Sequence, residues 1–224
     1  MHSPQQIAFV LNEDSQLLQL VDAAFADSAR RSGEHLVCHP GCTQCCHGAF
    51  AISPLDAFRL RAGISQLQQQ NPALAQSIEQ RAHAYIDTFS ATFPGDPATG
   101  ILGASDEDQE AFDDFANEAA CPALNPESGL CDIYFARPMT CRVFGPPIRA
   151  AEESAETGQA AFAVCELCFT QASPEEIAAS ELHIPHAEEQ RLDTLLQNAN
   201  SEDQPASEPN ETIVAYCLIP AHKP

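Results

Sequence analysis

The sequence predicts a mainly α-helical, single compact domain with one small β-hairpin, in which cysteine-rich loops connect the helices. Two observations favour this class. Apolar residues recur at three- and four-residue spacing through several long segments, which is the period of a helix. Short apolar runs bounded by turn residues, as in strands, stand at residues 121–134 and 212–219. The 224 residues, 44% of them hydrophobic, suffice to bury a core.

Two helices are expected on either side of the first cysteine group. The first covers residues 15–31, and its apolar stripe fades at Ser28. The second covers residues 53–62, because Ser53 is a good N-cap and Gly63 is a stop signal. The stripe of the first helix consists of Leu17, Leu18, Val21, Ala24 and Phe25.

A third helix and an acidic fourth helix follow. The third runs from residue 72 to about residue 93. After the turn-rich segment 94–100, residues 105–120 are expected to form the acidic helix. The predicted core positions are Leu74, Ile78, Ala82, Tyr85 and Phe89 in the third helix, and Phe112, Phe115 and Ala119 in the fourth.

The second half of the chain is expected to be less regular. Residues 121–124 and 130–134 are predicted to form a hairpin that leads into a short helix opening at Pro138. Residues 150–160 and 198–211 are polar and acidic, which is typical of loops. The remaining predicted elements are helices near 174–180 and 187–197 and a strand at 212–219.

The cysteines determine the expected domain organisation. Apart from Cys217, they begin at Cys38 and end at Cys168. We therefore divide the chain into a helical segment, a cysteine-cluster core and a C-terminal extension packed on the same domain. These parts are residues 1–37, 38–170 and 171–224.

Charge and hydropathy argue against two classes of partner. The chain carries 32 acidic and 10 basic residues, a formal net charge of −22, which repels the phosphates of nucleic acids. No stretch approaches the roughly 18–20 apolar residues of a membrane span. The first residues lack the basic flank of a secretory signal, so we expect a cytoplasmic location.

Ten cysteines are the most unusual feature of the composition. In a reducing compartment they favour metal ligation or redox chemistry over a disulfide framework. Four of them stand in the run Cys38-His-Pro-Gly-Cys42-Thr-Gln-Cys45-Cys46. Such short spacings let consecutive thiolates converge on one cation, in zinc sites and iron–sulfur clusters alike.

The adjacent Cys45 and Cys46 leave three alternatives open. Neighbouring side chains point in different directions, so both rarely reach one mononuclear ion. They serve two metals, or one is a ligand and the other is buried, or both bind a wider multi-iron cluster.

Further cysteine motifs follow the first run. Cys121-Pro-Ala-Leu precedes Cys131-Asp-Ile-Tyr, and Arg137-Pro-Met-Thr-Cys141-Arg precedes a further Cys165. In this order the motifs resemble the signature of the YkgJ-type cysteine-cluster family, whose CxxCxxCC domain is described as zinc- or iron-chelating. The resemblance spans residues 38–165 and implies eight metal ligands: Cys38, Cys42, Cys45, Cys46, Cys121, Cys131, Cys141 and Cys165.

Two cysteines lie outside this pattern. Cys168 forms a Cys-x2-Cys with Cys165 and is an alternative ligand. Cys217, within the apolar tail, is expected in the core. The histidines that flank the first run are further alternative ligands: His35, His39 and His47.

The charge of the ligands bears on the identity of the metal. Eight thiolates exceed the charge of one divalent ion, which favours two zinc-sized sites or one iron–sulfur cluster, of the 4Fe-4S type, with spare thiols. Arg137 and Arg142 flank Cys141. We expect them either to stabilise its thiolate, together with the helix at Pro138, or to form ordinary ion pairs.

The expected function is metal binding, with a zinc or iron–sulfur centre that is structural, a reservoir or a redox sensor. The alternative is a cluster-dependent enzyme, because flagellin lysine N-methylases contain a similar cysteine cluster and are thought to use adenosylmethionine. The sequence shows no Gly-rich loop between a strand and a helix and no nucleophile elbow, P-loop or His-Glu-x-x-His motif. We therefore assign no catalytic residue, and a metal ion is the one partner that we expect.

Overall fold

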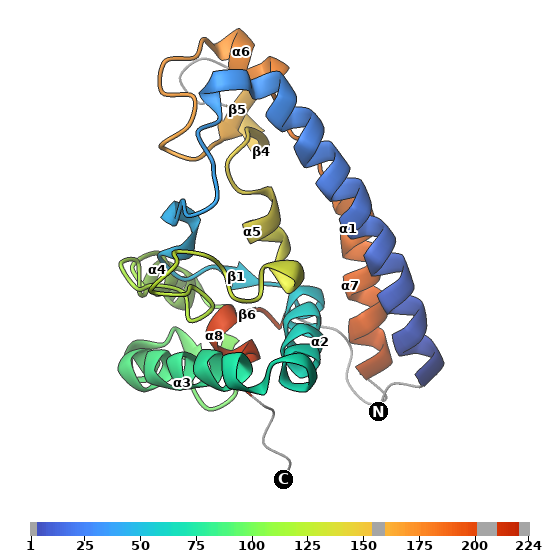
Figure 1. Ribbon diagram of the computed structural model, residues 1–224, viewed down its shortest axis with the longest axis vertical. Helices are drawn as coiled ribbons and strands as arrows, with labels where there is room; N and C mark the ends of the chain where they lie inside the picture. Colours follow the sequence, from blue (N-terminus) through green and yellow to red (C-terminus); the bar gives the residue numbers. More distant parts are fainter. Residues whose placement is uncertain (1–3, 154–159, 201–209, 220–224) are drawn as a thin grey trace. The chain divides into compact units, whose positions relative to one another are not determined.

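The computed structural model of the protein describes residues 4–153, 160–200 and 210–219 (Figure 1). It confirms a mainly helical class with small antiparallel sheets. The contacts within the chain gather in two compact units. Unit 1 comprises residues 1–39 and 142–195, and unit 2 comprises residues 40–141 and 196–224. The three-part division proposed from the sequence stays a prediction.

Unit 1 is built around a long first helix, α1 (Pro4–Ser32), which begins well before the predicted residue 15. Its buried face includes Leu17 and Val21, as expected. The face does not fade at Ser28, which is 0% exposed. The hydroxyl of Ser28 donates to the carbonyl of Ser180 (2.6 Å). A small hydroxyl can take a core position because its hydrogen bond is satisfied there.

Two further helices of unit 1 accompany α1. The α6 helix (Pro174–Ala179) has a capping box formed by Ser173 and Glu176. The α7 helix (His186–Asn200), which belongs to unit 1 up to residue 195, lies beside α1 in Figure 1, and Arg191 pairs with Glu13 across them (3.2 Å). Both helices agree with the predicted segments to within a few residues.

A strand pair in unit 1 corrects the predicted loop at residues 150–160. Strands β4 (Ile148–Glu153) and β5 (Ala160–Ala163) are antiparallel, with Arg149 opposite Phe162. The guanidinium of Arg149 lies over the ring of Phe162, 5.1 Å from its centroid, which supports this register. Residues 154–159 of the predicted loop lie outside the described residues.

Unit 2 begins with a 3-10 turn, η2 (Gln44–Cys46), and strand β1 (Ala51–Ile52). The α2 helix (Pro54–Gln70) passes through Gly63, so the predicted stop is wrong. A Cβ at Gly63 would lie 2.4 Å from the Cβ of Ala136. Glycine stands there because the helix packs closely against another segment, not because the helix ends.

The α3 helix (Pro72–Phe89) ends slightly before the predicted boundary and continues as a 3-10 turn, η3 (Ser90–Thr92). Ile78, Ala82 and Tyr85 are buried, as predicted. Strands β2 (Gly95–Asp96) and β3 (Ile101–Leu102) then form a short antiparallel pair.

The acidic helix and the hairpin are both shorter than expected. The α4 helix (Asp106–Asp113) ends seven residues before the predicted residue 120, although Phe115 is buried as predicted. The hairpin is reduced to one antiparallel bridge, between Leu124 and Cys131. It leads through η4 (Tyr134–Ala136) into α5 (Met139–Val143).

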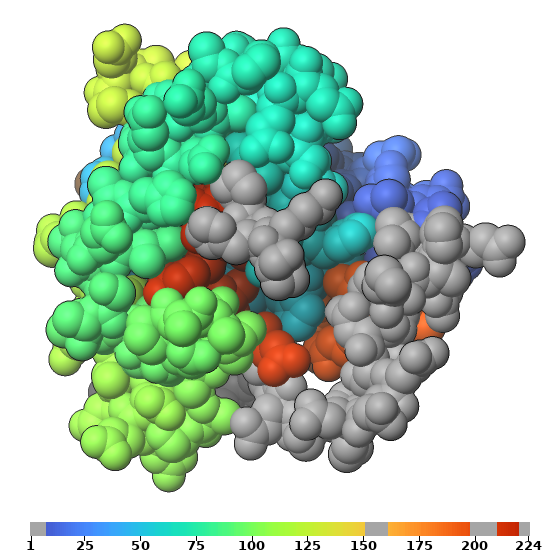
Figure 2. Space-filling view, turned by 90° about the horizontal axis from the view of Figure 1, so that it is seen from below, coloured from blue at the N-terminus to red at the C-terminus, as the bar shows by residue number. Residues whose placement is uncertain are grey.

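The C-terminal segment corrects the predicted strand 212–219. Only β6 (Thr212–Ile213) is extended, and it pairs with β1. The chain then turns into α8 (Val214–Cys217), which packs against both α2 and α3. Figure 2 shows red residues of this segment next to the green residues of α3. The turn brings Cys217 and Leu218, both 0% exposed, into the main apolar core.

Within the described ranges, no helix combines the length and the apolar character that crossing a bilayer would require.

Candidate metal centre

The first cysteine run of unit 2 lies directly beside the Cys121 segment. The backbone N–H of Cys121 donates to the carbonyl of Cys46 (2.7 Å). Next to this contact, His47 and Ala120 form an antiparallel bridge. The N–H of Gly48 donates to the carbonyl of Ala119 (2.9 Å). Cysteines that are far apart in the sequence are therefore neighbours on paired backbones.

Cys131 joins the same group through the short hairpin. The bridge between Leu124 and Cys131 is supported by the N–H of Asp132, which donates to the carbonyl of Ala123 (2.8 Å). The N–H of Asn125 donates to the carbonyl of Leu130 (2.8 Å) and closes the turn. The backbone of Cys46 thus pairs with Cys121, and the segment that begins at Cys121 pairs in turn with Cys131 through Leu124.

Cys141 shares its electrostatic surroundings with this group. Burial, followed by the charges of Cys121, Cys45 and Cys131, raises the pKa of the Cys141 thiol well above its usual value. Burial, together with the charges of Cys131 and Cys45, raises the pKa of Cys121 to about 11. Burial also raises the pKa of Cys131. The expected stabilisation of a thiolate at Cys141 by the short α5 helix is therefore outweighed.

Cys45 and Cys46 form a hydrogen-bonded pair. The Cys46 thiol donates to the Cys45 sulfur, which lowers the pKa of Cys45 to about 6. The same bond raises the pKa of Cys46 well above its ordinary value. The hydrogen bond therefore favours the thiolate at Cys45 and the neutral thiol at Cys46.

These shifts bear on how a cation would be bound. Cys46, Cys121, Cys131 and Cys141 all have raised pKa values and are neutral thiols at pH 7. A cation that binds thiolates must displace their protons. The affinity for such a cation is therefore expected to rise with pH.

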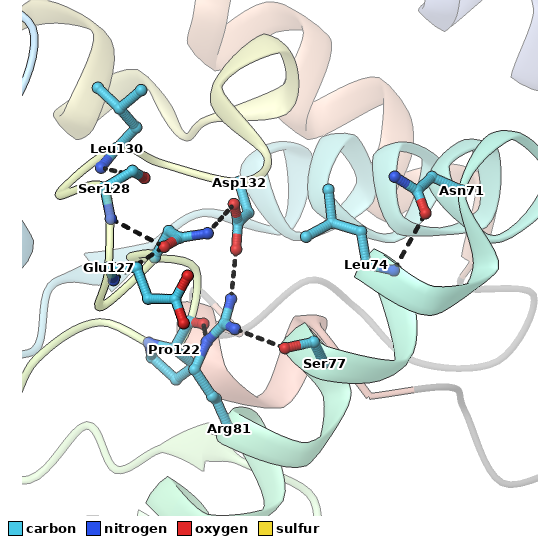
Figure 3. A network of polar contacts seen from close by, with 10 residues as sticks. Asn71, Leu74, Ser77, Arg81, Pro122, Glu127, Ser128, Leu130 and Asp132 are labelled. Carbon is cyan, nitrogen blue, oxygen red and sulfur yellow. Dashed lines mark hydrogen bonds and ion pairs between the residues drawn. The ribbon is translucent and has the colours of Figure 1, made fainter.

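Arg81 fixes the segment that carries two of these cysteines (Figure 3). From α3, its Nε donates to the carbonyl of Pro122 (2.7 Å), and Nη2 pairs with Asp132 Oδ2 (2.7 Å). Its Nη1 donates to the hydroxyl of Ser77 (2.9 Å). The other carboxylate oxygen of Asp132 accepts from the amide of Asn125 (3.1 Å). One guanidinium thereby holds the residues that directly follow Cys121 and Cys131. No motif in the sequence identifies Arg81, whereas Asp132 stands next to a predicted ligand.

We expect Arg81→Ala to lower the free energy of unfolding by about 2–3 kcal/mol, because it leaves the Asp132 carboxylate, 10% exposed, without its cation. It should also weaken metal binding by about 10–100-fold, as loss of a residue that orients ligands does. Thermal denaturation and chelator competition measure the two effects. Arg30→Ala, which removes an ion pair whose arginine is 75% exposed, is the matched control and should change neither by much. Unchanged metal affinity in Arg81→Ala would show that the contacts serve stability alone.

The two arginines beside Cys141 have different surroundings. Arg137 lies over the ring of Tyr134, 3.8 Å from its centroid, and its charge lowers the pKa of Cys45 and opposes the rise at Cys131. Arg142 belongs to unit 1, where it pairs with Asp22 (2.8 Å). The ion-pair alternative thus describes Arg142, and Arg137 provides positive charge near the thiols of unit 2.

The remaining predicted ligands are placed as follows. Cys42 is partly buried in unit 2, on the loop that leads into η2. Cys38 and Cys165 belong to unit 1, together with Cys168. Cys217 is buried in the core of unit 2, as expected, although in a helix and not in a strand. The flanking His35 lies 3.7 Å from Glu176, and Nδ1 of His47 lies 3.0 Å from the carbonyl of Thr43.

The donor set suits a soft or borderline metal. All ten cysteines lie among the described residues and are thiols, not disulfides. Thiolates bind both zinc and iron–sulfur clusters. Across the described ranges, no three or more His, Cys, Asp or Glu side chains are already arranged to hold one ion. The eight-ligand set therefore stays a prediction, while the grouping of Cys45, Cys46, Cys121, Cys131 and Cys141 is a feature of the structure.

Comparison with known proteins agrees with this chemistry. A family model described as a putative zinc- or iron-chelating domain matches residues 37–166. No curated protein and no solved structure matches the chain. The family match covers more than half of the sequence and contains all eight predicted ligands. The chain therefore belongs to the CxxCxxCC family of zinc- or iron-chelating domains.

Proposed function

We propose that unit 2 holds a thiolate-ligated metal centre, zinc or iron–sulfur, whose nucleus is formed by five cysteines. The observation that carries this proposal is the pairing of the Cys46 backbone with Cys121, extended to Cys131 by the Leu124 bridge. The five cysteines are Cys45, Cys46, Cys121, Cys131 and Cys141, with Cys42 as a sixth candidate on the adjoining loop.

The number of thiols argues against a single zinc ion as the whole centre. A tetrahedral zinc site takes four ligands, and the nucleus alone offers five. The hydrogen bond between Cys45 and Cys46 means that both sulfurs lie on the same side of the turn, despite their adjacent positions. This favours a cluster, or two ions, over one mononuclear ion. The charge of Arg137 offsets part of the negative charge that such a centre gathers.

A metal bound here would also stabilise unit 2. It would join the turn at residues 44–46 to the hairpin at residues 121–131 and to α5, and so close long loops. Structural zinc sites contribute about 10–16 kcal/mol of apparent binding free energy at pH 7, which appears as folding free energy. The centre is therefore proposed to be structural at the least, whatever further role it has.

Elemental analysis of anaerobically purified full-length protein tests the proposal. Brown protein with broad visible absorption, iron and acid-labile sulfide would identify an iron–sulfur cluster. Colourless protein with stoichiometric zinc would identify a zinc centre. Protein that holds neither metal, and that gains none on incubation with zinc or with iron and sulfide under reducing conditions, would contradict it.

The methyl-transfer alternative has its own test. The family match describes chelation and adds no support for methyl transfer. Calorimetry of the metal-loaded protein with adenosylmethionine would reopen that alternative if heat and a thermal shift were observed.

A further inference from the structure

The cysteines of unit 1 form a group of their own. The sulfur of Cys38 lies 3.9 Å from the sulfur of Cys168. Two thiolates bound to one tetrahedral zinc, each at about 2.3 Å, are about 3.8 Å apart. A disulfide instead requires the sulfurs to be about 2.05 Å apart. The two thiols, which are in hydrogen-bond contact, are thus already about as far apart as two ligands of one ion.

The backbone shapes a turn that presents Cys165 and Cys168 together. The N–H of Cys168 donates to the carbonyl of Cys165 (2.8 Å). The next residue, Phe169, has a φ of 57°, a left-handed conformation that costs a non-glycine residue on the order of 1 kcal/mol. This conformation is held by the N–H of Phe169, which donates to the carbonyl of His35 (2.9 Å), and by stacking of the two rings. The turn is thereby fixed to the segment that leads to Cys38.

Gly145 makes room for the sulfur of Cys38. A Cβ at this position would lie 2.9 Å from that sulfur, and the φ of Gly145 is 122°. The carbonyl of Gly145 accepts from the N–H of Cys165 (3.4 Å). Three separate segments of unit 1 therefore converge on these sulfurs.

The surroundings suit a bound cation that enters from one side. Cys165 and Cys168 are only 5% and 3% exposed and share an apolar cluster with Phe169. Leu36, Phe144, Ala172 and Ile177 pack against this cluster. Cys38, by contrast, is exposed to solvent. The low local dielectric strengthens attraction between a thiolate and a cation, and Cys38 gives the cation access.

We propose that Cys38, Cys165 and Cys168 bind a second thiophilic divalent cation, of the zinc class, within unit 1. Cys168 lies outside the region that the family model matches. Because no three such side chains in the described part of the chain are already arranged around one point, binding turns at least one of the sulfurs toward the other two. Three protein ligands leave the fourth position to water or to a small external thiolate. Each coordinated thiol releases its proton to solvent.

Zinc titration of the full-length protein under reducing, anaerobic conditions, with a competing chelator, tests this second site. Cys168→Ala should lose one bound zinc equivalent, or bind it at least tenfold more weakly, while the metal of unit 2 is retained. Cys131→Ala should show the reverse. Cys217→Ala, equally buried but outside both groups, is the matched control and should bind as the unaltered protein does. Cys38→Ser changes an exposed residue and replaces Cys168→Ala if that variant fails to fold.

The possible results separate the two proposals. Zinc binding that is unchanged in both Cys168→Ala and Cys38→Ser overturns the second site and leaves the centre of unit 2 intact. Loss of all zinc from Cys131→Ala also overturns it, because unit 1 would then hold none by itself. Zinc that is lost from Cys168→Ala but not from Cys131→Ala supports the second site. The nucleus proposed for unit 2 is contradicted if Cys131→Ala also keeps all the iron that the unaltered protein holds.

Discussion

Cys131→Ala is expected to bind the metal of unit 2 at least about 100-fold more weakly than the unaltered protein does. The variant should therefore lose this metal and melt at a lower temperature. Losing a residue that merely orients a ligand costs about 10–100-fold, and losing a ligand costs at least as much. Cys131 forms the antiparallel bridge with Leu124, which places it three residues along that segment from Cys121. Chelator competition and thermal denaturation, each with and without added metal, measure the two effects.

Cys217→Ala provides the comparison for this variant. Cys131 packs against the same apolar cluster in which Cys217 is buried, and both changes remove one sulfur atom. The small loss of packing is therefore common to both, and only Cys131→Ala should lose metal. If the two variants lost stability equally and kept the same metal content, Cys131 would be a core residue and not a ligand.

Asp56→Ala is expected to lower the free energy of unfolding of the metal-free protein by about 3–5 kcal/mol. Asp56 and Arg59 are 3% and 6% exposed. Asp56 Oδ1 accepts from Arg59 (2.5 Å) and from the N–H of Met139 (2.8 Å), the first residue of α5. Removing the carboxylate takes one partner from a buried guanidinium and removes a hydrogen bond that holds the first residue of α5, the helix that carries Cys141.

Urea denaturation measures the free energy of unfolding, and chelator competition shows whether the substitution also changes the metal affinity. Asp27→Ala is the matched control, because that carboxylate also pairs with arginines but is 50% exposed, and its loss should change stability far less. Asp56→Asn keeps an oxygen for the N–H of Met139 and should fall between the two. An Asp56→Ala protein as stable as Asp27→Ala would refute the assigned role of the buried pair.

The helices were largely predictable because their apolar period and caps are local signals. Ser53 accepts from the N–H of Asp56 at the start of α2, as the sequence predicted. Gly63 was misread because the same residue can end a helix or permit close packing, and only the position of Ala136 decides between them. Ser28 and the segment from Val214 to Leu218 were misread for a similar reason. Their burial depends on partners that are distant in the sequence.

The candidate site shows the same division. The short spacings of the first run pointed to Cys45 and Cys46, and the resemblance to the cysteine-cluster family pointed to Cys121, Cys131 and Cys141, because spacing and motif order are properties of the sequence itself. The residues that hold these cysteines in place could not be predicted from spacing or motif order. Arg81 carries no motif, and its role follows from the hydrogen bonds to Pro122 and Asp132. The closeness of Cys38 to Cys168 likewise depends on the turn at Phe169 and on the space left by Gly145.

The C-terminal segment that begins with β6 and continues into α8 limits how short a folded fragment can be. The family match ends at residue 166, yet Cys217 and Leu218 fill the core against which Cys121 and Cys131 pack. A fragment of residues 37–166 would leave that core open. During synthesis, the five cysteines proposed to bind metal in unit 2 are made before Cys217 and Leu218, so an ion would meet a complete scaffold only after translation has passed residue 218.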